Sequence, residues 1–286
     1  MSSLTLASAT PSTLQPSASK RWRHQWRIAF TMLPLVLLLA MTLFGSRIGP
    51  FDPDEVQVGQ RLQPPSREHP MGTDPLGRDV ASRVLAGAQV SIPSVLVIVV
   101  SALIVGVTLG AVAGYLGGPV DNALMRVTDV FLAFPALVLA LAITGALGPD
   151  LTTAMLAVSV VWWPWYARLI RGQVLSLKHE PYVEAARSLG CSDGRVVGRH
   201  ILPNAVAPVV VQATLDMGAA LVTTASLGYI GMGAQPPSAE WGAMLSQARS
   251  FFLNAWWLTA FPGLAIFLTV LIFNAVGDLA RATLSR

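Results

Sequence analysis

The chain has 286 residues, of which 53% are hydrophobic and 12% are charged, and its formal net charge is +4. Soluble globular domains carry about 25% charged residues, so the composition excludes an ordinary water-soluble fold and favours a chain embedded in lipid. The single cysteine excludes an intrachain disulfide and indicates no metal site, and no basic run is interleaved with aromatic side chains, which argues against a nucleic-acid partner.

The amino-terminal residues 1–19 are rich in Ser, Thr, Ala and Pro without periodicity, and we expect them to form a disordered cytoplasmic tail. Behind this tail, six segments approach or exceed the roughly 20 mostly apolar residues that a membrane-spanning helix needs. Because lipid offers the backbone no hydrogen-bond partners, such segments must be helical. We therefore predict an all-α membrane protein with six transmembrane helices, at 28–44, 92–115, 130–147, 151–167, 205–230 and 255–276.

The charge distribution orients these helices. Four basic residues crowd the entrance to the first segment, and positive charge near the end of a span tends to stay in the cytoplasm. Both termini and the loop 168–204 are then cytoplasmic, although the loop 45–91 places five arginines outside. A secretory signal is the alternative for the first segment, but no small-residue cleavage pattern follows Phe44.

The chain lacks the motifs of an enzyme. A phosphate-binding loop of the form GxxxxGK[ST] is missing, because neither Lys20 nor Lys178 follows a glycine. The sequence also shows no HExxH pair, no GxSxG elbow and no acidic cluster at metal-ligand spacing. We expect no catalytic residue, no metal and no nucleotide site on this chain, so that ATP-driven movement of a solute would require a separate ATPase at the cytoplasmic face.

The inner loop 168–204 reads as two short helices. Pro181 suits the first turn of a helix, Glu184 lies where the positive helix end favours an acid, and Gly190 suits the left-handed closing position. The first helix offers a face with little side-chain bulk that a partner's groove can grip, although an ordinary interfacial helix explains the same features. The residues of this face are Ala185, Ala186 and Leu189.

A second helix is expected in the same loop. Ser192 or Asp193 can cap its start. We expect this helix to stop before Pro203, because the residue that precedes a proline disfavours the helical conformation. The fifth span would then start anew at residue 205.

The spacing within this loop resembles that of a known family. Glu-Ala-Ala at 184–186, a glycine at 190 and His-Ile-Leu-Pro at 200–203 look like the EAA loop of permease subunits in binding-protein-dependent ATP-binding-cassette (ABC) importers. The resemblance implies that this loop receives a separate ATPase subunit and couples it to transport. The coupling residues that it implies are Glu184, Ala185, Ala186, Leu189, Gly190, Ile201, Leu202 and Pro203.

Two further stretches resemble one branch of this family. The segment before the second span contains HPMGTD at 69–74 and LGRD at 76–79, and the exit of the fifth span contains ASLGYIGMG at 225–233. Both are similar to the C-type permeases of dipeptide, oligopeptide and nickel importers, and the similarity covers about residues 20–286. The second stretch implies a turn-rich surface on which a substrate-binding protein docks. The docking residues that it implies are Gln235, Pro236, Pro237 and Trp241.

The resemblance also implies an architecture and a set of partners. It implies the type I ABC importer permease fold in the inner (plasma) membrane of a bacterial cell. Residues 20–91 would form the first helix and an outer segment, and residues 92–286 a five-helix transmembrane domain with the coupling loop 168–204. The implied partners are a second permease subunit that forms a heterodimer with this chain, two ATPase subunits that hold ATP and Mg²⁺, and an extracytoplasmic binding protein. The implied cargo is a di- or oligopeptide, with nickel or another small solute as the alternative.

Asp216 is the one charged residue deep inside a predicted span, and burial of such a group is costly enough to mark a candidate functional site. It either faces the translocation path and meets a peptide amino group, or forms a structural hydrogen bond with a neighbour such as Gln212. In an ion-coupled secondary transporter Asp216 would be the coupling site, but no inverted repeat or pair of broken helices is evident. A membrane enzyme would need at least two reactive groups at one depth, and the sequence offers one.

Overall fold

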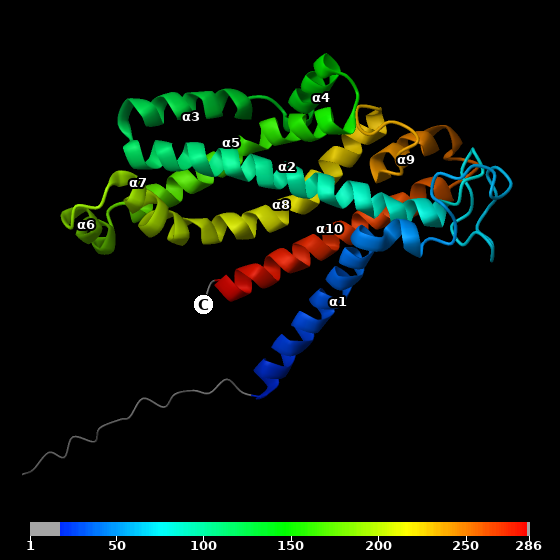
Figure 1. Cartoon of the computed structure of the whole chain (residues 1–286), viewed down its shortest axis with the longest axis horizontal. Helices are drawn as coiled ribbons and strands as arrows, with labels where there is room; N and C mark the ends of the chain where they lie inside the picture. Colours follow the sequence, from blue (N-terminus) through cyan, green and yellow to red (C-terminus); the bar gives the residue numbers. More distant parts are fainter. Residues whose placement is uncertain (1–17, 285–286) are drawn as a thin grey trace, which may run out of the picture.

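The computed structural model describes residues 18–284, so the predicted tail 1–19 lies almost wholly outside the described residues. All regular elements in the described part are helical, which confirms the all-α prediction there (Figure 1). The long helices are α1 Ala18–Ile48, α2 Val80–Leu116, α3 Gly118–Leu132, α4 Ala136–Leu147, α5 Leu151–Leu177, α8 Leu202–Ile230 and α10 Trp257–Leu284. The short elements are α6 Pro181–Ser188, α7 Asp193–Arg195, a π-helical turn Val196–Ile201, α9 Trp241–Ala248 and a 3-10 turn Arg249–Phe251.

Three helices of the described residues are long and apolar enough to cross a membrane. They are α2, the continuous helix Asp193–Ile230, and Trp257–Thr283 within α10. The bent pair of α3 and α4 makes a fourth candidate, and α1 contributes the shorter apolar stretch Met32–Ile48. These lengths agree with a helical membrane protein, whereas the count of six spans and the cytoplasmic placement of both termini stay predictions.

The predicted third span, 130–147, is wrong as one straight helix. α3 ends at Leu132, α4 begins at Ala136, and the pair is bent by 87°. Pro135 stands at the N-cap of α4, where it lacks the N–H that would continue the helix and disfavours helical backbone at Phe134. After the bend, α4 packs against α5 and touches α8.

Small residues bring α2 and α5 into close contact. A Cβ atom added to Gly106 would lie 2.5 Å from the Cβ atom of Tyr166, and one added to Gly110 would collide with the carbonyl oxygen of Ala167. Glycines at this four-residue spacing let the backbones of two helices approach closely. The contact fixes the position of Tyr166, whose side chain lines a cavity described below.

The segments 49–79 and 231–256 meet at one end of the molecule, and we call them the outer unit, following the predicted orientation (Figure 1). Arg83, with 1% of its surface exposed, joins them, because its guanidinium donates to oxygens of both segments at 2.8 to 3.1 Å. The acceptors are the carbonyl oxygens of Pro53, Pro237 and Ser238 and the carboxylate of Asp54. A buried guanidinium that lost these acceptors would be strongly destabilising, so the two segments are held together.

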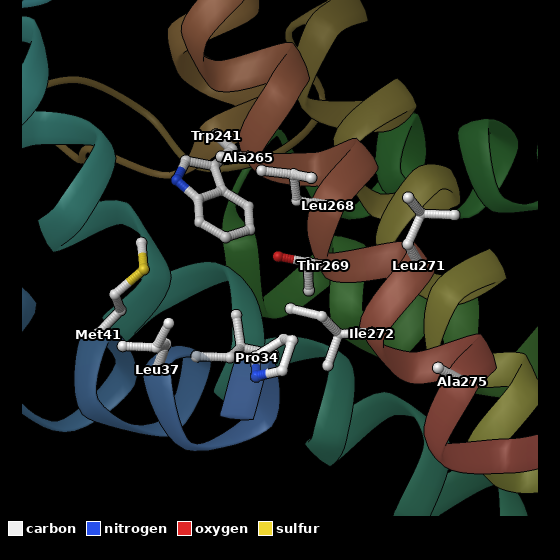
Figure 2. Close-up of a pocket in the computed structure, with 11 residues that line it drawn as sticks. Pro34, Leu37, Met41, Trp241, Ala265, Leu268, Thr269, Leu271, Ile272 and Ala275 are labelled. Carbon is white, nitrogen blue, oxygen red and sulfur yellow. The ribbon is translucent and has the colours of Figure 1, made fainter. Parts of the chain in front are cut away.

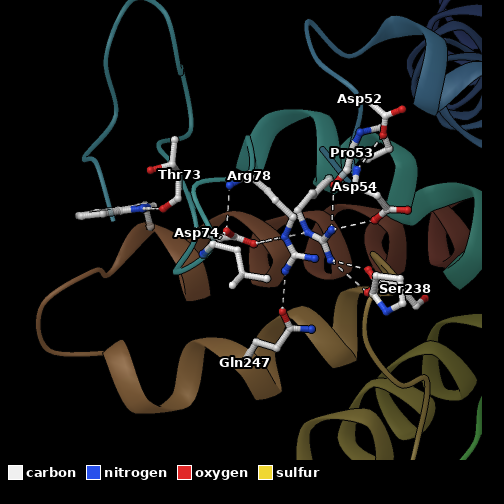
Figure 3. A network of polar contacts seen from close by, with 12 residues as sticks. Asp52, Pro53, Asp54, Thr73, Asp74, Arg78, Ser238 and Gln247 are labelled. Atoms are coloured by element: carbon white, nitrogen blue, oxygen red, sulfur yellow. Dashed lines mark hydrogen bonds and ion pairs between the residues drawn. The ribbon is translucent and has the colours of Figure 1, made fainter. Parts of the chain in front are cut away.

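Two further contacts link the segment 49–79 to α9, which belongs to the outer unit, and to the start of α10. The guanidinium of Arg78 bridges Asp74, at 2.6 Å, and the side-chain oxygen of Gln247 in α9, at 3.1 Å (Figure 3). The indole N–H of Trp257 donates to the carbonyl oxygen of Thr73 at 3.1 Å. The first contact strengthens the outer unit internally, and the second anchors it to the start of α10.

Candidate functional site

The predicted coupling loop contains α6, and local chemistry sets the start of this helix. Glu180 has an extended backbone and precedes Pro181, whose fixed φ suits the first helical turn. The carbonyl oxygen of Glu180 accepts from the backbone N–H groups of Val183 and Glu184 at 2.9 and 3.2 Å. Glu184 lies in the first turn with its side chain exposed, where the helix dipole favours negative charge. The first predicted helix of the loop is thereby confirmed.

α6 ends in a Schellman motif. Gly190 has a φ of +80°, a left-handed conformation that glycine adopts without the penalty of a side chain. The N–H of Gly190 donates to the carbonyl oxygen of Arg187 at 2.9 Å, and that of Cys191 donates to Ala186 at 3.1 Å. These bonds satisfy carbonyl groups of the last turn and reverse the chain immediately after the helix.

The residues of the predicted contact face of α6 differ in their exposure to solvent. Ala185 and Leu189 are exposed, and 85% of the surface of Leu189 is open. Ala186 is buried together with Val183, because residues three apart share a helix face and this face packs onto the rest of the chain. The expectation that Ala186 belongs to the open face is wrong. Among the predicted coupling residues of α6 and its C-cap, Glu184, Ala185 and Leu189 are exposed, and we refer to the surface that they form as the exposed face of α6.

The sequence predicts that the second helix of the loop stops before Pro203, and this prediction is wrong. α7 runs through the π-helical turn into α8 as one continuous helix. The N–H of Leu202 donates to the carbonyl oxygen of Val197, five residues earlier, and Pro203 lies in the first turn of α8, where a missing N–H is tolerated. Ile201 is buried, Leu202 is half-buried and Pro203 is exposed.

The coupling loop is fastened to the end of α2. The hydroxyl of Tyr115 donates to Asp193 at 2.5 Å, and the guanidinium of Arg187 lies 5.1 Å from the centre of the Tyr115 ring. The ammonium of Lys178, near the start of the loop, donates to the carbonyl oxygen of Gly114 at 3.3 Å. A displacement of α6 therefore acts on α2 through these contacts and on α8 through the continuous helix.

A cavity of 540 Å³ lies between α4, α5 and α8, and Asp216 reaches it from α8. The Oδ1 atom of Asp216 accepts from the amide of Gln212 at 2.9 Å, and both side chains line the cavity. The hydrogen bond to Gln212 is therefore compatible with a position of Asp216 on the translocation path, the other role suggested by the sequence. The aromatic wall of this cavity is not among the predicted site residues, and the run WWPWY at 162–166 is the sequence signal that indicates it. The lining residues are Ala136, Trp162, Trp165, Tyr166, Leu169, Gln212, Asp216, Ala219 and Thr223.

A second cavity, of 480 Å³, has different chemistry (Figure 2). It lies between α1 and α10, with the indole ring of Trp241 at one end and mostly aliphatic side chains elsewhere. Among its described lining residues, Thr269 carries the one hydroxyl, and the indole N–H of Trp241 is already bonded to the carbonyl oxygen of Val84 at 2.9 Å. This cavity suits an apolar occupant and offers little to a polar solute.

The structure removes Trp241 from the predicted docking surface. Its side chain is 0% exposed and packs against α2, where Gly87 makes room for it: a Cβ atom there would lie 2.6 Å from the indole. The hydrogen bond to Val84 holds the ring in place. The prediction that Trp241 contacts a binding protein is therefore wrong. The other three predicted docking residues, Gln235, Pro236 and Pro237, are exposed.

Glu240 is a buried helix cap that is not among the residues predicted from the sequence. Its carboxylate accepts from the backbone N–H groups of Gly242 and Ala243 at 2.9 and 2.8 Å and from the hydroxyl of Ser91 at 3.3 Å. Burial raises the pKa of this carboxyl, and the three hydrogen bonds oppose the rise. An acid directly before the apolar run WGAML is a signal for a helix start and could have indicated this role.

Long apolar helices define a helical membrane protein, and a carboxylate at mid-helix beside a cavity is typical of membrane proteins that carry a solute or ion pathway. Residues 106–286 match the family model described as binding-protein-dependent transport system inner membrane component. The chain belongs to this family. Its predicted membrane location and the family resemblance of its loops are thereby confirmed.

Three named proteins are similar over most of their length. "Probable D,D-dipeptide transport system permease protein DdpC" of Escherichia coli K12 is 48% identical over 244 residues, which cover 85% of this chain and 82% of that protein. The dipeptide transport system permease protein DppC of Alkalihalophilus pseudofirmus is 44% identical over 257 residues, 90% of this chain and 83% of that one. The glutathione transport system permease protein GsiD of Pectobacterium atrosepticum is 41% identical over 271 residues, 92% of this chain and 90% of that one.

Solved structures share the fold at low sequence identity. A chain of the inward-facing MetNI methionine ABC transporter superposes with a TM-score of 0.57 at 19% identity, over 70% of this chain and 95% of that chain. A chain of an amino acid ABC transporter with histidines gives a TM-score of 0.52 at 19% identity, over 69% of this chain and 92% of that chain. The fold is that of ABC transporter membrane subunits, as predicted.

Proposed function

We propose that this chain is the permease subunit of an ATP-driven importer that carries di- or oligopeptides across the inner membrane, coupled to separate ATPase subunits through α6. The observation that carries the proposal is the similarity to three permeases whose names specify D,D-dipeptides, dipeptides and glutathione, the last itself a small peptide. The identity of at least 41% extends over most of both chains in each comparison.

The exposed face of α6 is the surface that the ATPase subunits would grip. It presents Leu189 as its most exposed apolar side chain, with Ala185 leaving the backbone accessible and Gly190 reversing the chain beside it. A short helix with one apolar anchor suits a groove on a partner protein. Ile201 acts from behind this surface by packing the π-helical turn, and the ATP and Mg²⁺ would be held by the ATPase subunits and not by this chain.

The connectivity of the loop supports a mechanism for coupling. ATP binding would draw the ATPase subunits together and carry α6 with them, which moves the end of α2 through Tyr115 and turns the continuous helix that contains α8. Asp216 is the middle residue of α8 (Leu202–Ile230), so a rotation of α8 changes the side to which the cavity faces. Rigid-body movement between two packed arrangements is what alternating access requires.

The remaining partners follow from the same architecture. A second permease subunit would close the pathway beside α5 and α8 as the other half of a heterodimer. An extracytoplasmic binding protein would deliver the peptide to the outer unit, where Gln235, Pro236 and Pro237 are exposed. Arg83 of α2 binds the carbonyl groups of Pro237 and Ser238. Binding of the extracytoplasmic protein at this surface would therefore act directly on α2.

Uptake by the reconstituted transporter tests the proposal. Proteoliposomes should contain this chain, its partner permease and the two ATPase subunits, with the binding protein and a radiolabelled dipeptide on its side of the membrane. We expect accumulation of the dipeptide against its gradient only when ATP is present on the ATPase side, and no ATP hydrolysis by the isolated chain. ATP turnover by the isolated chain, or ATP-driven accumulation of nickel without any peptide, would contradict the proposal.

A further inference from the structure

The cavity between α4, α5 and α8 holds one carboxylate that lacks a cationic partner. None of the ion pairs among the side chains described, those of residues 32–283, includes Asp216, and the described residues that line the cavity contain no lysine, arginine or histidine. Gln212 is a neutral donor and does not compensate the charge. Asp216 is the middle residue of a helix long and apolar enough to cross the membrane, so its negative charge carries a free-energy cost. A cation that enters the cavity would lower this cost.

Tyr166 supplies a second group that lacks a partner. Its side chain is 1% exposed, it lines the same cavity, and its hydroxyl lies beside the Asp216 carboxylate without a hydrogen bond of normal geometry to any described residue. A buried hydroxyl without a partner costs free energy, which a ligand can recover by bonding to it. The close contact between Gly106 and the Cβ atom of Tyr166 holds the ring at this position before any ligand arrives.

Two indole rings complete the chemistry of the cavity wall. Trp162 and Trp165 come from α5, and both line the cavity that Asp216 enters from α8. Aromatic faces attract ammonium groups, and the attraction is stronger away from water. A volume of 540 Å³ lies within the range of about 300 to 1,000 Å³ that small-ligand sites occupy. A single carboxylate without histidine or cysteine is a poor site for nickel, which prefers nitrogen ligands.

We propose that this cavity is a transient binding site for the amino-terminal ammonium group of the peptide in transit. Asp216 acts as its counter-ion, Gln212 orients the carboxylate, the hydroxyl of Tyr166 accepts a hydrogen bond from the ammonium, and the indole rings of Trp162 and Trp165 shield it. The inference rests on the proposed function, because it names the part of the peptide that the pathway recognises. It predicts selection for a free amino terminus within the membrane, separate from any selection by the binding protein.

Binding to the assembled transporter without its binding protein tests this site. The complex of this chain, its partner permease and the ATPase subunits is titrated in detergent with radiolabelled alanyl-phenylalanine, and N-acetyl-alanyl-phenylalanine is the competitor that lacks the ammonium. Three variants are compared with the wild type. Asp216→Asn removes the charge, Tyr166→Phe removes the hydroxyl, and Asp278→Asn is the matched control, because Asp278 is an exposed carboxylate on α10 away from the cavity.

We expect Asp216→Asn to raise the dissociation constant by about tenfold or more and Tyr166→Phe to raise it severalfold, with Asp278→Asn unchanged. The acetylated peptide should compete poorly on the wild type. Equal affinity for both peptides, an unchanged affinity in Asp216→Asn, or the absence of saturable binding overturns the inference. Should Asp216→Asn fail to assemble, the two peptides measured on the wild type and on Tyr166→Phe decide the question. ATP-driven uptake without this binding leaves the proposed function standing, whereas loss of peptide uptake by the wild type refutes the function itself.

Discussion

The closing turn of α6 allows a graded test of the coupling loop. Gly190 has a φ of +80°, and no atom lies within 4 Å of a Cβ atom added there. Alanine at this position therefore creates no clash, and its cost is the left-handed conformation itself, about 1 to 2 kcal/mol. Proline costs more, because its φ is fixed near about −65° and it removes the N–H that donates to Arg187. Asparagine tolerates the left-handed region and should cost less than alanine.

A free-energy penalty of this size reduces the fraction of molecules in which the left-handed turn at position 190 ends α6 correctly. A cost of about 1 to 2 kcal/mol is a factor of roughly 5 to 30, which is the largest loss of ATPase affinity that we expect for Gly190→Ala. Uptake should fall in the order glycine, asparagine, alanine, proline, and Gly190→Pro should abolish it while the chain remains inserted. ATPase retention on a tagged chain and dipeptide uptake are measured on the same preparations.

Gly194 provides the matched control for this series. It lies in α7 of the same loop, an added Cβ atom there also meets nothing within 4 Å, and its φ is not positive. Gly194→Ala should therefore retain uptake and ATPase association. Normal uptake and normal association in Gly190→Pro would refute the reasoning, because the loop would then be only a connector. An equal loss in Gly194→Ala would refute it as well.

Three other changes test separate parts of the structure. Glu184→Lys places a positive charge at the positive end of α6 and on its exposed face, so it should abolish uptake while leaving insertion intact; wild-type uptake would remove Glu184 from the coupling surface. Because burial raises the pKa of Glu240 above its unfolded value of about 4.3, stability is greatest below that pH and falls as pH rises through the folded pKa. Glu240→Gln should lose this part of the pH dependence of thermal unfolding, and equal slopes in variant and wild type would contradict the burial argument. A membrane-impermeant thiol reagent should reach Cys191 only from the cytoplasm and a cysteine introduced at Ser238 only from outside, and the reverse pattern would invert the topology.

Features determined within one helical turn were predictable from the sequence. Pro181 and Glu184 mark the start of α6 by the rules of helix initiation, and Gly190 marks its end by its conformational freedom. These rules depend on the nearest neighbours along the chain and not on tertiary packing. The all-α class was predictable for a related reason, because a run of apolar residues in lipid has few alternatives to a helix.

Features that depend on tertiary packing were not predictable. Trp241 is buried because Gly87, far away in the chain, leaves space for its ring, and Ala186 is buried because α6 turns that face inward. Pro203 looked like a helix stop, yet the wider π-helical turn before it lets the helix continue. The cavity around Asp216 combines residues of three helices, and no spacing within one segment indicates that they meet.

Protection of position 189 by the ATPase subunits shows whether α6 is the surface that they grip. In a Cys191→Ser background, Leu189→Cys places a thiol at a position whose native side chain is 85% exposed in the chain alone. We expect rapid reaction with a soluble maleimide in the isolated chain and strong protection once the ATPase subunits are bound. Equal reaction rates in the isolated chain and in the assembled transporter would contradict the claim that α6 is the surface through which ATP hydrolysis reaches this subunit.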